Sequence, residues 1–259
     1  MNEVEALKQY NLMKFVAKYH NDRQQNRTVE FDYLSQDKVQ LAQICCRSNI
    51  FSATKKAQHV HSVFHHTRLG KVTIDTYVQL TQKDLDILLV LLHECSLRDT
   101  YTFTISMRYI CKKLNISYGT APVKRIKSSL SNLTKMIVEA ELGDALETCI
   151  MGSFLNATVT RNGVDIDIRK SLLPLFESST VIDLKKRLTY SNSFTKYMYN
   201  FVCSSSIPVK LDALQQISGK ENRAFKLFNS DLKKAMNELL TSSVIRDWHI
   251  DVHHRLCWK

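Results

Sequence analysis

The architecture of this chain follows from one segment, Tyr101–Glu141, which reads YTFTISMRYICKKLNISYGTAPVKRIKSSLSNLTKMIVEAE. Its pattern predicts a β-prone run, a short helix, a polar turn and a long helix, at Tyr101–Ile105, Met107–Leu114, Asn115–Gly119 and Thr120–Glu141. Ser106 can cap the short helix, and Pro122 is tolerated in the first turn of the long one. Two helices joined by such a turn predict a helix-turn-helix.

The segments on either side extend this motif. A helix that opens with an acidic capping box is expected over Thr81–Glu94. Strand-like segments are expected over Leu146–Thr160 and Val164–Ile168, and the Asn-Gly pair at 162–163 favours a tight turn between them. Helix, strand, short helix, turn, long helix and hairpin together describe a winged helix, in which the hairpin is the wing.

The same order recurs later in the chain with different residues, and the turn glycines Gly119 and Gly219 stand 100 positions apart. The second copy is expected over Phe194–Val202, Ile207–Lys210, Asp212–Ile217, Glu221–Leu240, Val244–Asp251 and Arg255–Trp258. The predicted fold class is α+β, mainly α, with two tandem winged-helix domains at residues 48–178 and 179–259. Residues 1–47 are expected to form an N-terminal extension, a helix followed by a linker.

The composition is that of a basic globular protein. Lys and Arg number 36 and Asp and Glu 25, so the formal net charge is +11. This sign suits a polyanionic partner such as nucleic acid or an anionic membrane surface, although a basic protein without such a partner is the simpler alternative. Six isolated glycines exclude a Walker phosphate loop and a GxGxxG turn, and with them nucleotide-driven motors and dehydrogenases.

The seven cysteines form no CxxC pair, which indicates reduced thiols in a cytoplasmic protein. The start of the sequence has no signal-peptide pattern, and the longest apolar run falls far short of the ~20 residues that a membrane span needs. We therefore expect a soluble cytoplasmic protein without membrane contact.

Each long helix has one apolar face and one polar face. In the first helix the apolar stripe consists of Val123, Ile126, Leu130, Leu133 and Ile137. In the second helix it consists of Phe225, Phe228, Leu232, Met236 and Leu239. The opposite faces are expected to meet solvent or a ligand. Leu227 also falls on an outer face, where a thymine methyl group or a neighbouring domain could cover it.

Basic and hydrogen-bonding side chains on the outer faces and wings are the predicted DNA contacts. On the first helix they are Lys124, Arg125, Lys127, Ser128, Ser131, Asn132 and Lys135, and on the second Lys220, Arg223, Lys226, Ser230 and Lys234, beside Asn237. The wings add Arg161, His254 and Arg255. Arg, Lys and Asn suit base edges, and Lys and Ser suit phosphates. A solvated face would explain either helix alone, but two at equivalent places favour double-stranded DNA as the partner.

Five segments resemble the TrfA-type plasmid replication initiators, and the resemblance spans about residues 48–259. The first three are GKVTIDTYVQLTQKDLDILLVLLHE (Gly70–Glu94), APVKRIKSSLSNLTKMIVE (Ala121–Glu139) and VTRNGVDIDIRKSLLPLF (Val159–Phe176). The other two are FTKYMYNFVCSSSIPVKLDALQQISG (Phe194–Gly219) and FKLFNSDLKKAMNELLTSSVIRDWHID (Phe225–Asp251).

The resemblance implies a function in plasmid replication and copy control. It implies two winged helices that bind direct repeats at an origin, opening of an adjacent AT-rich region, and recruitment of the host replication initiator and the replicative helicase. It also implies that a DNA-binding monomer is in balance with a homodimer. Nothing in the first forty-odd residues matches this family.

The sequence predicts no enzyme, no cofactor and no metal site. Candidate metal ligands are His59, His61, His65, Cys45 and Cys46, but they have no established metal-site spacing. Candidate catalytic groups are Tyr197, Tyr199 and the pairs Asp84/Asp86 and Asp165/Asp167. Core packing explains the tyrosines better than nucleophilic catalysis, and no cleft motif joins the carboxylates.

The competing function is a winged-helix transcriptional repressor. That interpretation predicts a palindromic operator and an obligate dimer, whereas an initiator predicts direct repeats and a monomer on DNA. A more distant alternative is a plasmid partition or conjugation adaptor, which would bind DNA without opening it.

Overall fold

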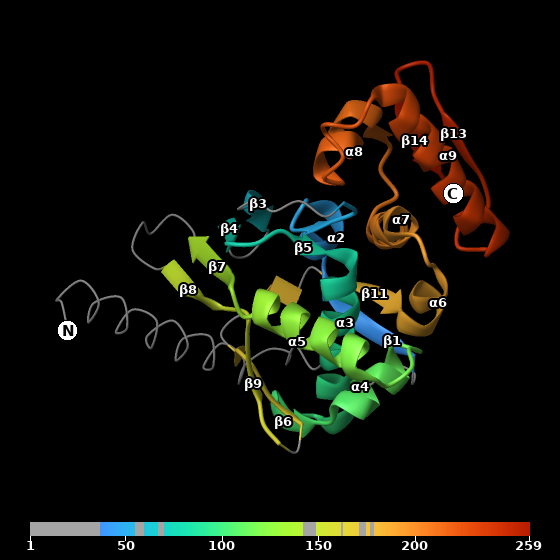
Figure 1. Cartoon of the computed structure of the whole chain (residues 1–259). Coiled ribbons are helices and arrows are strands. Elements are labelled where there is room, and N and C mark those ends of the chain that lie inside the picture. Colours follow the sequence, from blue (N-terminus) through green and yellow to red (C-terminus); the bar gives the residue numbers. More distant parts are fainter. Residues whose placement is uncertain are drawn as a thin grey trace.

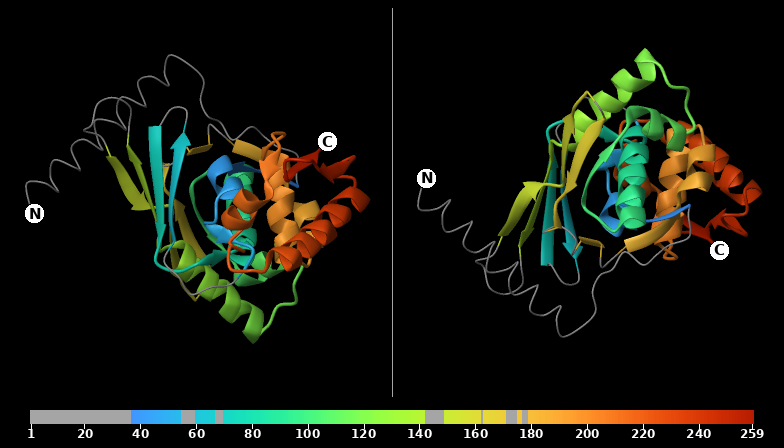
Figure 2. Two further views of the ribbon diagram at one scale, coloured as in Figure 1. Left: turned by 90° about the horizontal axis from the view of Figure 1, so that it is seen from above. Right: turned by 90° about the horizontal axis from the view of Figure 1, so that it is seen from below.

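The structure, a computed structural model, describes residues 37–54, 60–66, 70–141, 149–161, 163–170, 175–176 and 179–259. Helices and short β-sheets share one apolar core (Figure 1). Seen from above in Figure 2, a sheet of cyan and yellow-green strands lies on one side and the orange and red helices on the other. Within the described ranges, every helix is too short or too polar to cross a membrane.

A first unit begins at α3 and ends at β10. Its elements are α3 (Gln82–Arg98), β6 (Thr102–Ile105), α4 (Met107–Lys113), α5 (Thr120–Leu133), β9 (Leu155–Val159) and β10 (Val164–Ile168). Strand β10 pairs antiparallel with both β6 and β9, so the sheet order is β6-β10-β9. Helix α3 is buried along most of its length and is the central support on which α4 and α5 pack.

A second unit repeats this element order. Its elements are α7 (Ser193–Ser204), β12 (Val209–Lys210), α8 (Leu211–Ile217), α9 (Phe225–Thr241), β13 (Trp248–Ile250) and β14 (Arg255–Trp258). Strand β14 pairs antiparallel with both β12 and β13, which gives the order β12-β14-β13. The last strand is therefore central in both three-stranded sheets, and α7 supports α9 as α3 supports α5.

The turn between the short and long helices has the same backbone geometry in both units. Asn115 and Gly219 are left-handed, with φ of 53° and 72°. Each donates its N–H to the carbonyl three residues earlier, at 3.1 Å and 2.9 Å, and the next residue, Ile116 or Lys220, donates to the carbonyl five residues earlier at 3.0 Å. These two bonds define a Schellman motif. The equivalent of Gly219 is therefore Asn115 and not Gly119, which has an extended backbone.

Both expected caps in the first unit are present. The carboxylate of Asp84 accepts hydrogen bonds from the backbone N–H and the hydroxyl of Thr81, each at 2.7 Å, and opens α3. The hydroxyl of Ser106 accepts the N–H of Tyr109 at 3.1 Å and opens α4. The N-terminal boundaries of these two helices therefore follow from local side-chain chemistry.

The first long helix is shorter than its sequence predicts. Helix α5 ends at Leu133, and Met136–Glu141 form strand β7, so Ile137 and Glu139 are strand residues. Strand β7 lies between β4 (Gly70–Thr76) and β8 (Cys149–Ser153), and β3 (Val60–His66) completes the sheet order β3-β4-β7-β8. Cross-strand pairing along all of β7 overrides the helical periodicity.

Part of the expected N-terminal extension belongs to the core. Strand β1 (Lys38–Ala42) pairs antiparallel with β11 (Ser179–Asp183), and α2 (Gln43–Arg47) packs on α7. Leu41 and Cys46 are fully buried. The expected helix and linker over residues 1–47 is therefore wrong for 38–47, while residues 1–36 lie outside the described ranges.

Two further pieces join the units. Strand β2 (Phe51–Ser52) pairs in parallel with β5 (Leu80–Thr81), directly before α3. Helix α6 (Leu184–Thr189) follows β11, and Asp183 caps it by accepting the N–H of Lys186 at 2.8 Å.

Candidate nucleic-acid interface

Helix α5 exposes a basic, hydrogen-bonding face. Its buried residues are Ile126, Ser129, Leu130 and Leu133, with spacings of three and four that place them on one side. The opposite side has the exposed Lys124, Arg125, Lys127, Ser128 and Ser131, and the partly exposed Asn132. Lys135 is exposed but lies in the turn after the helix. No acidic residue falls within Thr120–Leu133, so the charge of this face is uniformly positive.

The N-terminal end of α5 adds to this positive charge. Its N-cap residue, Gly119, has no side chain to accept the N–H groups of the first turn. These groups contribute the partial positive charge of the helix dipole, and Lys124 lies one turn further along. A phosphate at this end would be bound by both.

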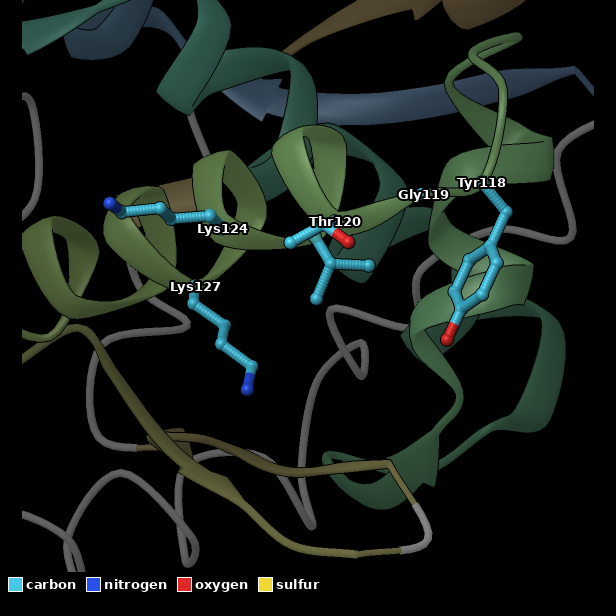
Figure 3. Close-up of a pocket in the computed structure, with 6 residues that line it drawn as sticks. Tyr118, Gly119, Thr120, Lys124 and Lys127 are labelled. Atoms are coloured by element: carbon cyan, nitrogen blue, oxygen red, sulfur yellow. The ribbon is translucent and has the colours of Figure 1, made fainter.

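A hollow of about 470 Å³ lies beside this end of the helix and is lined by Tyr118, Gly119, Thr120, Val123, Lys124 and Lys127. Figure 3 shows Tyr118 and Lys127 extending on the same side of the helix, while Lys124 points away from them. The guanidinium group of Arg108 lies 5.2 Å from the centroid of the Tyr118 ring. Sequence reasoning missed both residues, although Tyr118 falls in the predicted turn and Arg108 in the predicted short helix.

Helix α9 presents a second exposed face. Phe228, Leu232, Ala235, Met236 and Leu239 are buried. Lys226, Ser230, Lys233, Lys234 and Asn237 are exposed. The oxygen of the Asn237 side chain accepts the indole N–H of Trp248 at 3.1 Å, which fixes that amide next to β13. Lys233 adds a cation that the prediction left out, and its place opposite the apolar stripe was the available signal.

Two predicted contacts at the start of α9 need correction, because the helix begins at Phe225 and not near Glu221. Lys220 is only 8% exposed, its ammonium group lies 2.7 Å from the Asp231 carboxylate, and it sits 4.4 Å from the centroid of the Phe194 ring. Arg223 precedes the helix and pairs with the same carboxylate at 2.7 Å. Lys220 therefore anchors the turn and is not available to DNA, and the charge of Arg223 is already paired.

The apolar prediction for α9 also needs one correction. Phe225 was expected in the inner stripe, but it is 47% exposed, and Leu227 is exposed as expected. Phe225 still touches the core through Phe228, with ring centroids 6.4 Å apart. The first turn of α9 therefore presents apolar surface next to Lys226.

The two hairpins expected to be wings have further candidates at the surface. Arg161 is exposed at the turn between β9 and β10. In the turn between β13 and β14, Arg255 pairs with Asp251 at 2.8 Å, and His254 is left-handed with φ of 55°. Val252 is 89% exposed at this tip. The first of these turns thus presents a cation, whereas the second presents an apolar residue followed by His253 and His254.

A buried carboxylate fixes α4 against α3. Glu94 accepts a hydrogen bond from the Tyr109 hydroxyl at 2.7 Å and lies 3.3 Å from Arg98 and 3.7 Å from Lys113. Burial alone would raise the pKa of Glu94, but His93, Tyr109 and the two cations outweigh burial and lower this pKa to about 2. Glu94 is therefore ionised at neutral pH and orients the short helix of the first unit.

Both long helices lie on the side of the molecule turned to the reader in Figure 1, α5 below the centre and α9 at the upper right. In the left view of Figure 2, α5 lies at the lower margin next to the four-stranded sheet into which it leads, and α9 lies on the other side of the molecule, among the orange and red elements. The polar face of each helix is exposed or partly exposed to solvent.

Several of the candidate metal ligands and catalytic groups lie in described parts of the chain, where their contacts can be given. His61 lies 2.8 Å from Asp75 across the β3–β4 pair, and His59 lies outside the described ranges. Burial raises the pKa of the Cys45 thiol to about 12, which disfavours the thiolate that binds metals. The Tyr197 hydroxyl is buried and donates to the Ile217 carbonyl at 3.0 Å. Asp86 pairs with the buried Arg187 and the partly buried Lys196 of the second unit.

No protein-family model matches the chain, and no curated protein does. Two crystal structures of RctB domains 2 and 3 resemble it. The selenomethionine derivative has a TM-score of 0.49 and 12% identity and covers 76% of this chain and 83% of that chain. The structure of RctB 155–483 has a TM-score of 0.48 and 12% identity and covers 76% and 82%.

Proposed function

We propose that this chain binds double-stranded DNA through two winged-helix units, with α5 and α9 as the recognition helices in neighbouring major grooves of one duplex. The main support is the repetition within the chain. The two units share element order, sheet order and a Schellman turn before the long helix. In each unit the long helix packs its apolar side inward and exposes lysines, serines and asparagine.

The residue types on these faces suit DNA. Lys124, Arg125 and Lys127 on α5 and Lys226, Lys233 and Lys234 on α9 provide the charge that phosphates attract. Asn132 and Ser131 on α5 and Ser230 on α9 provide hydrogen-bonding groups that can meet base edges. Arg161 at the first wing is placed to reach a neighbouring phosphate or the minor groove.

The geometry defines the expected site. Recognition helices in successive major grooves lie one helical turn, about 10 base pairs, apart, so one chain would cover about 20 base pairs. Because the two helix faces differ in sequence, the two halves of this site should differ too. A single chain would then read an asymmetric site, and several copies of such a site would stand as direct repeats.

Within this class, we propose the role of a replication initiator that binds direct repeats at an origin, opens an adjacent AT-rich region and recruits host replication proteins. This role rests on the resemblance of the five segments to TrfA-type initiators. The competing role is a transcriptional repressor, which would need a two-fold symmetric pair of chains on a palindrome.

The direct test is selection of duplexes from a random library of about 40 base pairs by the purified chain, followed by sequencing and footprinting. The proposal predicts an enriched asymmetric site of about 20 base pairs. Failure to enrich any sequence would contradict it. Permanganate reactivity of a neighbouring AT-rich tract, dependent on the protein, would separate an initiator from a repressor. A palindromic site would favour the repressor.

A further inference from the structure

A buried polar network joins the two units, and Arg187 lies at its centre. Arg187 belongs to α6, has 0% exposure and uses all three guanidinium nitrogens. Its Nη1 donates to the carboxylate of Asp86 on α3, and its Nη2 donates to the side-chain oxygen of Gln82 on α3 at 2.7 Å. Its Nε donates to the side-chain oxygen of Asn200 on α7 at 3.0 Å. One side chain therefore bonds to the supporting helix of each unit.

The network extends beyond Arg187 through Asp86 and Gln82. Lys196 of α7 donates to the second oxygen of Asp86 at 2.5 Å, so this carboxylate also bonds to both units. The amide nitrogen of Gln82 donates to the carbonyl of Phe51 in β2 at 2.5 Å. The Asn200 side-chain nitrogen is buried without a hydrogen-bond partner among the described residues. The charged groups themselves are paired, since all three guanidinium nitrogens of Arg187 and both carboxylate oxygens of Asp86 are hydrogen-bonded, so any displacement would leave charge unpaired in the interior.

A second attachment lies at the turn before α9. Just after β2, the N–H of Ala53 donates to the Ser218 carbonyl at 3.1 Å, and the hydroxyl of Thr54 donates to the Gly219 carbonyl at 2.7 Å. The contact is close enough that a Cβ on Gly219 would lie 2.0 Å from the Ser52 hydroxyl oxygen. The turn that orients α9 is thus bound to the segment that precedes α3.

Each supporting helix packs directly on its own long helix. Ile126, Leu130 and Leu133 of α5 are buried where α5 packs on α3. On the other side, the rings of Phe194 in α7 and Phe228 in α9 have centroids 5.7 Å apart, and Thr195 donates to Glu238 at 2.7 Å. A fixed relation between α3 and α7 therefore fixes the relation between α5 and α9.

From this arrangement we infer that the Arg187–Asp86–Gln82–Asn200–Lys196 network is a positioning element that sets the one spacing at which two half-sites are bound together. The inference rests on the proposed function. DNA rotates by about 70° over two base pairs, so a rigid pair of helices cannot follow a half-site displaced by that amount. If the units were joined loosely, the second unit would bind as a tethered module and accept several spacings.

The variant Arg187→Met tests the inference with little disturbance of charge, because Asp86 keeps Lys196 as its partner. Lys196→Met is the second variant and leaves Arg187 paired with Asp86. Arg98→Met is the matched control, since Arg98 also pairs with a buried carboxylate, Glu94, but only within the first unit. None of the three residues lies on an outer face of α5 or α9. Unfolding curves establish which variants are folded before DNA is added.

Each folded protein selects from a random duplex library, and its affinity is then measured on the selected site with zero, one or two base pairs inserted between the half-sites. The wild type and Arg98→Met should select two sequence blocks at one separation and lose about tenfold or more in affinity on insertion. Arg187→Met should select the same sequence blocks at several separations, and its affinity should fall less than about threefold when base pairs are inserted between the half-sites. If Arg187→Met does not fold, the same result is expected of Lys196→Met.

The outcomes separate the two proposals. A folded network variant that still selects its two half-sites at one fixed separation would overturn the positioning inference and leave DNA binding intact. A wild type that selects the half-sites at several separations would do the same. A wild type that enriches no sequence would overturn DNA binding itself. Loss of binding by a folded variant on every spacing, without any change in spacing preference, would also count against positioning.

Discussion

Asn115 and Gly219 occupy the same place in the two units of one chain. Each is the left-handed residue that ends a short helix, and each is followed by an N–H that donates to the carbonyl five residues earlier. Asparagine and glycine are the two residues that adopt this conformation most readily. The short helix that precedes each long helix thus ends in the same backbone geometry in both units.

Gly219 and Gly119 should differ in their sensitivity to the same substitution. Gly219→Ala should lower the free energy of unfolding by about 1–3 kcal/mol, because its φ is 72° and a Cβ would meet the Ser52 side chain at 2.0 Å. Gly119→Ala is the matched control and should change it by less than about 1 kcal/mol, because its backbone is extended and the nearest atom would be 3.9 Å away. Denaturant unfolding of both variants measures this, and equal losses would contradict the assignment of the turn.

Glu94 should make stability depend on acid. Its pKa is lowered from 4.5 to about 2, so its contribution is complete above about pH 4.5 and is lost as the pH falls toward 2. Glu94→Gln should therefore cost about 1–3 kcal/mol at neutral pH, and the difference from the wild type should shrink in acid. Urea unfolding at about pH 7 and about pH 3 tests this, because other carboxylates titrate equally in both proteins. A difference that is constant between these conditions would show that the charge of Glu94 is not involved.

Single cations and single amides on the helices should have different effects on DNA binding. Lys124→Ala or Lys226→Ala should weaken binding to all sequences by a similar factor, because lysine at these positions meets phosphates. Asn132→Ala should instead alter preference at one base-pair position by about 1–3 kcal/mol. Lys38→Ala removes an exposed cation from β1, away from both helices, and should leave affinity unchanged. Affinities on a panel of single-base variants of the selected site distinguish these cases, and a uniform loss for Asn132→Ala would remove it from base reading.

Salt should weaken binding steeply. If about six to eight phosphates are neutralised, log K should fall against log salt with a slope near −5 to −7. Lys124→Ala should reduce the magnitude of this slope by about one. Titrations at several salt concentrations give the slope directly. A slope near zero would mean that the basic faces of α5 and α9 do not meet the DNA backbone.

Much of the element order can be predicted from the sequence, and the departures have physical causes. The caps at Thr81 and Ser106 and the apolar stripes of α5 and α9 are local patterns, and they define helices reliably. Strand β7 could not be predicted, because Met136–Glu141 pair with residues sixty or more positions earlier in β4 as well as with β8. The same reason hid strand β1, whose partner β11 lies at Ser179–Asp183.

The candidate site departs from the sequence prediction in one further way. Periodicity places a charged residue on a face, but it does not reveal a partner from another helix. Lys220 was therefore assigned to DNA although Asp231 and Phe194 bury it, and Arg187 was overlooked although it joins the two units. Ion pairs between residues on different helices become apparent only in the folded structure.

The central claim is that α5 and α9 read one duplex in neighbouring major grooves. Guanine N7 methylation protection on the selected site tests it most directly, because N7 faces the major groove. We expect two protected blocks with centres about 10 base pairs apart, of which Lys124→Ala weakens one and Lys226→Ala the other. A single protected block, or two variants that weaken the same block, would contradict the claim.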